Sequence, residues 1–148
     1  MDKVVQNYLE TFGIREETQR FLTRPQKMLI GGAWVPQGDR ESCTVLEPST
    51  AGVITHIPLG TTTDLDRAVD AARKQFDGGP WRKLKPLERE RLLHRLADLI
   101  EANATELAEI ESIDVGKSVA NARDVDVQAR STPSAISPVG HRSSTAVR

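Results

Sequence analysis

Hydrophobic residues recur along the chain at two different spacings. Between residues 28 and 57, short β-rich runs alternate with turn-forming Gly, Pro, Ser and Asp residues. This texture is typical of short strands joined by tight connections. It predicts a strand meander, with runs at 28–35 (interrupted by two glycines), 44–46 and 53–57.

From about Thr61 the apolar spacing changes to the helical period of 3.6 residues. The first predicted helix carries Leu65, Val69 and Phe76 on one face, with Thr63 as its cap. Three more helical stretches are predicted: one begins near Pro86, one follows a cap at Asn103, and one begins near Ser118. The apolar stripe of the second helix comprises Leu92, Leu93, Leu96, Ala97 and Ile100.

The two ends of the chain differ from this middle part. Residues 1–26 show short helical patterns, and we expect them to form a peripheral helical leader. Residues 127–148 are rich in Ser, Thr, Arg and Pro, with no periodicity of either kind, and this composition predicts a disordered tail. The fold class is therefore α/β, with residues 27–126 as its ordered part.

Composition narrows the class of protein. The 148 residues suit one domain, and the net charge of −1 argues against a partner that is a nucleic acid or an anionic membrane. One cysteine excludes an intrachain disulfide framework. No apolar run approaches the about 20 residues of a membrane span, and the first residues do not resemble a signal peptide. We therefore expect a cytoplasmic protein.

Phosphate-binding patterns are incomplete in this sequence. Gly116-Lys117-Ser118 resembles the end of a phosphate-binding loop, but Glu111 stands where the first glycine of that motif belongs. No G-x-G-x-x-G run occurs either. Gly116 is more simply interpreted as the end of a helix.

Catalytic and metal-binding patterns are equally weak. Cys43 lies in a β-rich run without a basic neighbour that would activate a thiol, and the three histidines show no metal-ligand spacing. Asp114, Asp124 and Asp126 could form a carboxylate cluster, although solvated positions near helix ends explain them better. From the residues alone, no reaction is identified.

Several blocks of the sequence nevertheless form a familiar ordered series. They are Met28-Leu29-Ile30-Gly31-Gly32-Ala33-Trp34-Val35, Glu47 to Ile54, Asp64 to Arg73, Phe76 to Trp81, Arg89 to Glu101, Glu106-Leu107-Ala108 and Glu111 to Lys117. Together they resemble the N-terminal part of the NAD(P)-dependent aldehyde dehydrogenase superfamily, from Met28 to about Asp126. Glu47 replaces the usual Asn, Ala51-Gly52 replaces Gly-Glu, and Val115 replaces Asn or Thr.

The resemblance implies that residues 27–126 form an incomplete cofactor-binding domain of a longer oxidoreductase, which converts an aldehyde to a carboxylic acid with NAD(P)⁺. The catalytic cysteine, the general-base glutamate and the cofactor motifs of the family match no position here. We therefore expect no bound cofactor and no catalysis by this chain alone. The resemblance also implies a monovalent cation site formed by the backbone oxygens of Val45 and Leu46 together with Asp114.

Three interpretations of the chain as a whole remain open. It is a truncated aldehyde dehydrogenase, a helical interaction protein that binds a full-length subunit, or the first part of a split enzyme whose remaining domains are encoded downstream. Residues 127–148 admit a further hypothesis. The first two bases of the codons for Ser134 to His141 permit Phe-Arg-Tyr-Leu-Ala-Gly-Trp-Ala in another frame, which resembles the family's continuation and suggests a frameshift.

Overall fold

A computed structural model of the protein describes residues 3–131, and side chains as far as residue 129. Helices predominate, and all four strands lie in the first half of the chain. In chain order the elements are α1 (Lys3–Thr11), α2 (Glu16–Thr23), β1 (Lys27–Ile30), β2 (Ala33–Pro36), β3 (Ser42–Leu46), β4 (Val53–Pro58), α3 (Thr62–Gly78), α4 (Pro80–Lys83), α5 (Pro86–Ala102), α6 (Ala104–Val115), α7 (Val119–Asn121), the π-helical turn η1 (Ala122–Val127) and α8 (Gln128–Ser131).

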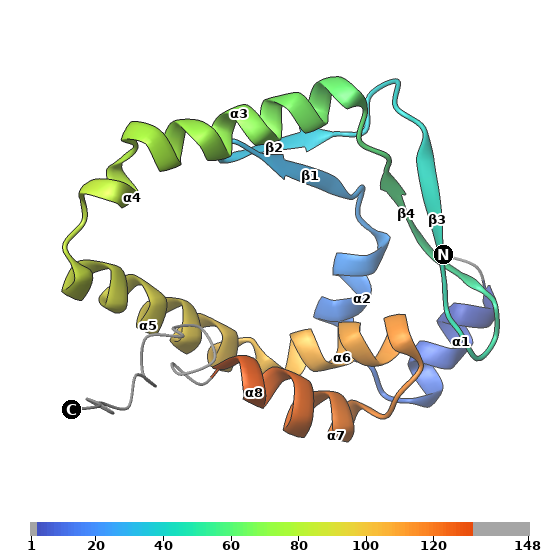
Figure 1. Ribbon diagram of the computed structural model, residues 1–148. Coiled ribbons are helices and arrows are strands. Elements are labelled where there is room, and N and C mark those ends of the chain that lie inside the picture. The colour runs from blue at the N-terminus through green and yellow to red at the C-terminus, as the bar shows by residue number, and fades with distance from the viewer. Residues whose placement is uncertain (1–2, 132–148) are drawn as a thin grey trace, which may run out of the picture.

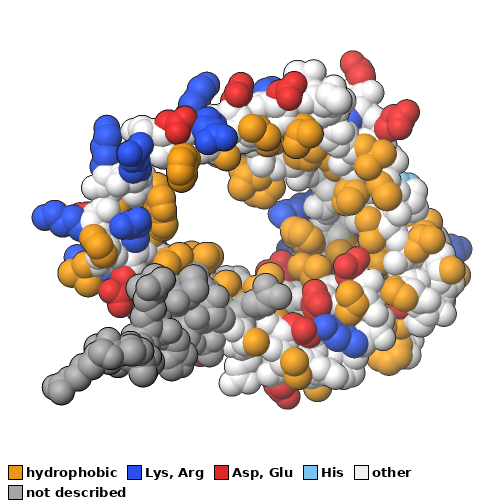
Figure 2. All heavy atoms as spheres, in the orientation of Figure 1, with side chains coloured by type: hydrophobic (Ala, Val, Ile, Leu, Met, Phe, Trp, Pro, Cys, Tyr) orange, Lys and Arg blue, Asp and Glu red, His pale blue; other side chains and the backbone are white. Residues whose placement is uncertain are grey.

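The elements are arranged around an open centre (Figure 1). Helix α3 forms the upper side in that view, α4 and α5 form the left side, and α6 to α8 close the ring below. The opening persists when all atoms are drawn as spheres, and hydrophobic side chains border it (Figure 2). The chain therefore surrounds a space that its own described side chains do not fill.

The strands form two separate antiparallel hairpins, so the predicted meander is wrong. Strand β1 pairs with β2, and β3 pairs with β4, but no hydrogen-bonded ladder joins the pairs within the described residues. Gly31 and Gly32 link β1 to β2 with φ values of 60° and 83°. A two-residue hairpin turn with both central residues at positive φ favours glycine at both positions.

The N-terminal leader is a central part of the main core, so its predicted peripheral position is wrong. Hydrophobic residues of the leader are buried together with Ile54 of β4 and Ile113 of α6. The buried members from the leader are Val5, Leu9, Ile14 and Leu22. Packing in this core stabilises the short leader helices, whose helical structure would be only marginally stable in water without tertiary contacts.

A second, smaller core joins α6 to the C-terminal helical segment, where Ala108, Ala122 and Val127 are buried together. Helix continues through Ser131, because α8 follows η1 directly. The predicted change to disorder at residue 127 is therefore wrong for 127–131. Residues 132–148, which carry the rest of the predicted tail and the frameshift hypothesis, lie outside the described residues.

Two helix caps predicted from the sequence do not form, and other hydrogen bonds occur at the same helix ends. Thr61, rather than Thr63, caps α3: its hydroxyl accepts a hydrogen bond from the Asp64 amide at 3.2 Å. Asn103 makes no side-chain cap for α6, and its side-chain amide nitrogen instead donates to the carbonyl oxygen of Leu99 at 2.7 Å.

No helix in the described part of the chain is both long and apolar enough to cross a bilayer.

Candidate functional site

The three residues predicted for a cation site lie at two element ends. Val45 and Leu46 are the last residues of β3, where the pairing with β4 shifts register. Asp114 lies in the last turn of α6, one residue before its end. A Cβ added to Gly116, directly after α6, would lie 3.3 Å from Pro48, so the ends of α6 and β3 approach one another closely.

Val45 and Asp114 line the same cavity, which has a volume of about 290 Å³. Leu46 is absent from that lining, and its side chain is exposed. The cavity lies between α2, β3, β4 and α6, and most of its other lining side chains are apolar, including Phe21, Leu22, Ile54, Ile110 and Ile113. The fold thus brings together two of the three residues, and the cation site stays a prediction.

Glu47, directly after β3, is a buried carboxylate at a position where the family pattern has Asn. Its carboxylate accepts hydrogen bonds from the amides of Ser49 and Thr50 at 3.1 and 2.7 Å, and from both of their hydroxyls. Burial raises the pKa of Glu47, but these hydrogen bonds outweigh it and hold the pKa below its usual range. The run Glu-Pro-Ser-Thr places two hydroxyl residues after an acid, and this pattern could have predicted the turn from the sequence.

Asp64 and Arg40 form a second structural carboxylate site at the start of α3. The Arg40 guanidinium binds the Asp64 carboxylate through two nitrogens, each 2.7 Å from a different oxygen. The same carboxylate accepts the Thr61 amide at 3.0 Å. The hydrogen bond from Arg40, followed by that from the Thr61 backbone, holds the pKa of Asp64 well below its usual range. This cluster fixes the loop after β2 against α3.

Lys117, the lysine of the incomplete phosphate-binding pattern, is already paired with carboxylates. Its ammonium group donates to Glu111 at 3.0 Å and to Asp126. Hydrogen bonds to Asp126 and Glu111 raise the pKa of Lys117. Ser118 caps α7 by accepting the Asn121 amide at 3.3 Å. The end of α6 therefore explains the run Gly116-Lys117-Ser118 without a bound phosphate. Asp126 is an ion-pair partner of Lys117.

Cys43 and His56 do not form a nucleophile and base pair. Cys43 is exposed on β3, and its Sγ lies 3.7 Å from the carbonyl oxygen of Thr44. His56 on β4 stands opposite Thr44, whose hydroxyl lies 3.3 Å from Nδ1. Neighbouring residues on a strand point to opposite faces, so the side chain of Cys43 lies on the other side of the hairpin. No group of three or more His, Cys, Asp or Glu residues in the described chain could hold a metal ion.

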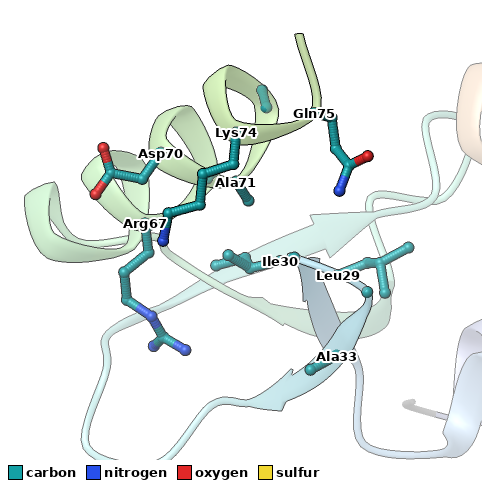
Figure 3. Close-up of a pocket in the computed structure, with 12 residues that line it drawn as sticks. Leu29, Ile30, Ala33, Arg67, Asp70, Ala71, Lys74 and Gln75 are labelled. Atoms are coloured by element: carbon teal, nitrogen blue, oxygen red, sulfur yellow. The ribbon is translucent and has the colours of Figure 1, made fainter. Parts of the chain in front are cut away.

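A hollow of about 850 Å³ lies between the turn of the β1–β2 hairpin and α3. Figure 3 shows Arg67 and Lys74 extending from α3 beside Ile30, while Asp70 points away from the hairpin. The lining combines these charged groups with small and aliphatic side chains. None of the residues predicted for a site contributes to it.

The N-termini of α3 and α5 and the glycine pair at 31–32 do not offer an open site for a phosphate group. Anions bind favourably at a helix N-terminus because its amides are unpaired and the helix dipole is positive there. At α3 the Asp64 carboxylate and the Thr61 hydroxyl already occupy that end, and at α5 the Glu88 carboxylate accepts the Lys85 amide at 2.7 Å. The glycine pair at 31–32 lies in a hairpin, rather than before a helix.

Comparison with known proteins gives a consistent result. The model of the family described as "Aldehyde dehydrogenase family" matches residues 34–136. The match begins later than the predicted Met28 and ends beyond the predicted Asp126, so it reaches into the segment 127–148. Phenylacetaldehyde dehydrogenase of Pseudomonas fluorescens is 38% identical over 108 residues, which are 73% of this chain and 22% of that protein. An aldehyde dehydrogenase of Alternaria alternata is 43% identical over 106 residues, 72% of this chain and 21% of its own length.

Solved structures agree with these sequence matches. The NAD⁺ complex of aldehyde dehydrogenase from Bacillus cereus superposes with a TM-score of 0.74 at 35% identity, over 78% of this chain and 24% of that one. A variant of aldehyde dehydrogenase C from Pseudomonas syringae, complexed with NAD⁺ and octanal, gives 0.67 at 34% identity, over 72% and 22%. The chain thus spans less than a quarter of the length of each of these relatives. By family match, sequence identity and fold, this chain belongs to the aldehyde dehydrogenase family.

Proposed function

We propose that this chain forms the opening segment of the cofactor-binding domain of an NAD(P)-dependent aldehyde dehydrogenase. The whole enzyme would oxidise an aldehyde to a carboxylic acid. The observation that carries the proposal is the superposition on 24% of a longer relative, with a TM-score of 0.74 to an enzyme solved with NAD⁺. The contribution of this segment is then structural: it supplies two hairpins and a set of helices against which the rest of the domain packs.

We further propose that the chain alone does not oxidise aldehydes. Hydride transfer requires the nicotinamide ring, a thiol and a base held in one site. The lone thiol, Cys43, is exposed on a hairpin, and the nearest histidine in that hairpin belongs to the opposite face. The N-termini of α3 and α5 already carry their own carboxylates.

An activity assay tests both proposals when it includes a chimera. The purified chain, mixed with octanal and NAD⁺ or NADP⁺, should give no increase in reduced nicotinamide absorbance above the buffer rate. A chimera in which this chain replaces the aligned quarter of the Bacillus cereus enzyme should fold and oxidise an aldehyde that the parent enzyme oxidises. Turnover by the chain alone would overturn the first expectation, and an inactive chimera beside an active parent enzyme would overturn the assignment as an enzyme segment.

A second candidate function is non-catalytic: association with a full-length aldehyde dehydrogenase subunit. The exposed hydrophobic residues of α3 and α5 favour an association of some kind. Co-purification of the tagged chain with an intact family member would support this role, and its absence would leave the enzyme-segment proposal as the better account.

A further inference from the structure

The hollow between the β1–β2 turn and α3 combines two cationic side chains with an apolar wall. Its volume of about 850 Å³ lies within the range of roughly 300–1,000 Å³ that is typical of small-molecule sites. Arg67 and Lys74 both line it, and their spacing of seven positions places them on one side of α3. Both elements contribute to the apolar wall, which comprises Leu29, Ile30, Ala33, Ala68, Ala71 and Ala72.

The geometry of α3 separates these two cations from Asp70, the acid that also lines the hollow. With 3.6 residues per turn, Arg67 and Lys74 lie within about 20° of one another around the helix axis. Asp70 lies about 40–60° further from Ala71, which is the position closest to the hairpin turn. Figure 3 shows Lys74 extending toward Arg67 beside Ile30, whereas the carboxylate of Asp70 points away from the hairpin. The hollow therefore presents positive charge on this side.

Neither cation is held in a close ion pair within the described part of the chain. Arg67 Nη1 lies 3.9 Å from Asp64, at the outer limit of an ion pair. The Asp64 carboxylate is already bound by two nitrogens of Arg40, each at 2.7 Å. The Lys74 ammonium forms no hydrogen bond or ion pair with residues 3–129. Both side chains are exposed at the hollow, so an anion can reach them.

The wall opposite the cations is formed by the hairpin turn. Gly31 and Gly32 have no side chains, and a Cβ added to Gly31 would lie 3.6 Å from the Cβ of Ala71. The turn therefore stands in close contact with α3 and closes one end of the hollow. Gln75 contributes a side-chain amide to the lining, with both a donor and an acceptor. The hollow thus has a charged side, an apolar wall and one neutral polar group.

We propose that this hollow binds an aliphatic monocarboxylate, with the carboxylate between Arg67 and Lys74 and the chain along the apolar wall. A guanidinium group binds a carboxylate through two parallel hydrogen bonds, and an ammonium group adds a compact charge. Two cations and one acid give the lining a net charge of +1, which one carboxylate neutralises and a phosphate dianion exceeds. Among the described residues, no aromatic side chain lines the hollow, and this favours an aliphatic chain over a ring that would stack.

The test is titration of the full chain with octanoate, followed by NMR through the amide shifts of Gly31 and Gly32. We expect saturable 1:1 binding with a dissociation constant on the order of 1 mM, and shifts of both amides. Octylammonium has the same chain with the opposite charge, and acetate has the same head group without the chain. Each should bind at least about tenfold more weakly than octanoate. The first comparison measures the contribution of the charge, and the second that of the apolar wall.

Substitution of either cation should weaken the binding of octanoate. Lys74→Gln, and separately Arg67→Gln, should raise the dissociation constant about fivefold or more, because each removes a charged donor from the carboxylate. Arg73→Gln is the matched control, since it removes the same charge from the neighbouring position of α3. Arg73 does not line the hollow, and its guanidinium carbon lies 6.0 Å from the ring centroid of Phe76. It should leave the dissociation constant within about twofold. All three positions are exposed, so the circular dichroism spectrum should stay unchanged.

Several results would overturn the proposal. Absence of saturable octanoate binding would reject the site. Equal binding of octylammonium, or octanoate shifts that fall on α5 and spare Gly31 and Gly32, would show that the chain binds at another apolar surface. Equal effects of Lys74→Gln and Arg73→Gln would show that only the overall charge matters, and tighter binding of inorganic phosphate would assign the hollow to another class of anion. The inference does not depend on the proposed function, so failure of either leaves the other in place.

Discussion

The two sides of the ring use the same kind of amphipathic helix and differ in what covers it. On one side the leader helices, the β3–β4 hairpin and α6 bury their apolar residues in a common core, where Leu9 and Ile113 are almost completely inaccessible. On the other side, α3 and α5 leave large apolar residues in contact with solvent. Amphipathic pattern therefore predicts which face of a helix needs a partner, but not whether this chain contains that partner.

The covered side is also joined by polar contacts between segments that are far apart in sequence. Glu109 of α6 accepts hydrogen bonds from the Thr18 hydroxyl and, at 3.1 Å, from Arg15 Nε. Thr18 and Glu109 are both buried, so each satisfies a group that would otherwise lack a partner. The open side shows no such long-range link between α3 and α5 among the described residues.

The largest effect should come from truncating the covered side. Leu9→Ala removes a fully buried side chain from the main core and should reduce the free energy of unfolding by about 2–5 kcal/mol. The matched change on the open side, Leu65→Ala, removes an exposed side chain and should cost about 0.5 kcal/mol or less. Urea denaturation followed by circular dichroism measures both. Equal losses would mean that the two sides do not differ in the way described.

The next effect concerns the link between leader and α6. Thr18→Val keeps the shape of the side chain and removes the hydroxyl that donates to Glu109. We expect a loss of about 1–3 kcal/mol in the free energy of unfolding, because a buried carboxylate loses a donor. Thr23→Val is a suitable control, since its hydroxyl bonds only to carbonyls within its own helix and is exposed. A loss no greater than that of the control would show that the leader is held by apolar packing alone.

Sequence patterns predicted the helices well because the apolar spacing and the breakers are local. Gly116, in the left-handed conformation with φ 73°, ends α6 as predicted, and α3 ends at Gly78, just before Gly79 and Pro80. The pairing of the strands was wrong, because hairpin turns such as Gly31-Gly32 determine neighbours within a pair but not whether two pairs join into one sheet. That choice depends on distant packing.

The role of the leader could not be predicted for the same physical reason. The pattern of Val5 and Leu9 predicts an apolar face, but only the three-dimensional contacts show that it packs with Ile113, more than a hundred positions later. For the candidate cation site, Val45 and Asp114 line one cavity and Leu46 does not, and the site stays a prediction. The buried roles of Glu47, Asp64 and Glu109 were missed, because a charged residue is most often exposed and its buried donors come from other segments.

Acidification should weaken the contact between the open side and the β2–β3 loop. The pKa of Asp64 lies below its usual range in the folded chain, so its carboxylate adds stability at neutral pH that is lost as the pH falls below about 4. Asp64→Asn should lower the midpoint of urea unfolding at pH 7 and flatten the decline in stability between about pH 4 and pH 2. At pH 7 we expect Asp64→Asn to lower the free energy of unfolding more than removal of the Thr61 cap does, since the Asp64 carboxylate also binds Arg40. Asp66→Asn, at an exposed position of the same helix, is the control and should leave the pH dependence unchanged.

The smallest effect distinguishes the cap that is formed from the cap that the sequence suggested. The Thr61 hydroxyl accepts the Asp64 amide and donates to the Asp64 carboxylate at 2.8 Å, whereas no such contact is described for Thr63. Thr61→Ala should therefore reduce the free energy of unfolding by about 1 kcal/mol, as loss of a helix N-cap does. Thr63→Ala should have an effect near zero or slightly stabilising, because alanine has the higher helix propensity. Thermal unfolding of the two variants at pH 7 measures the difference. If Thr63→Ala were the more damaging change, α3 would begin where the sequence placed its cap, and the Asp64 cluster would not be what fixes that end of the open side.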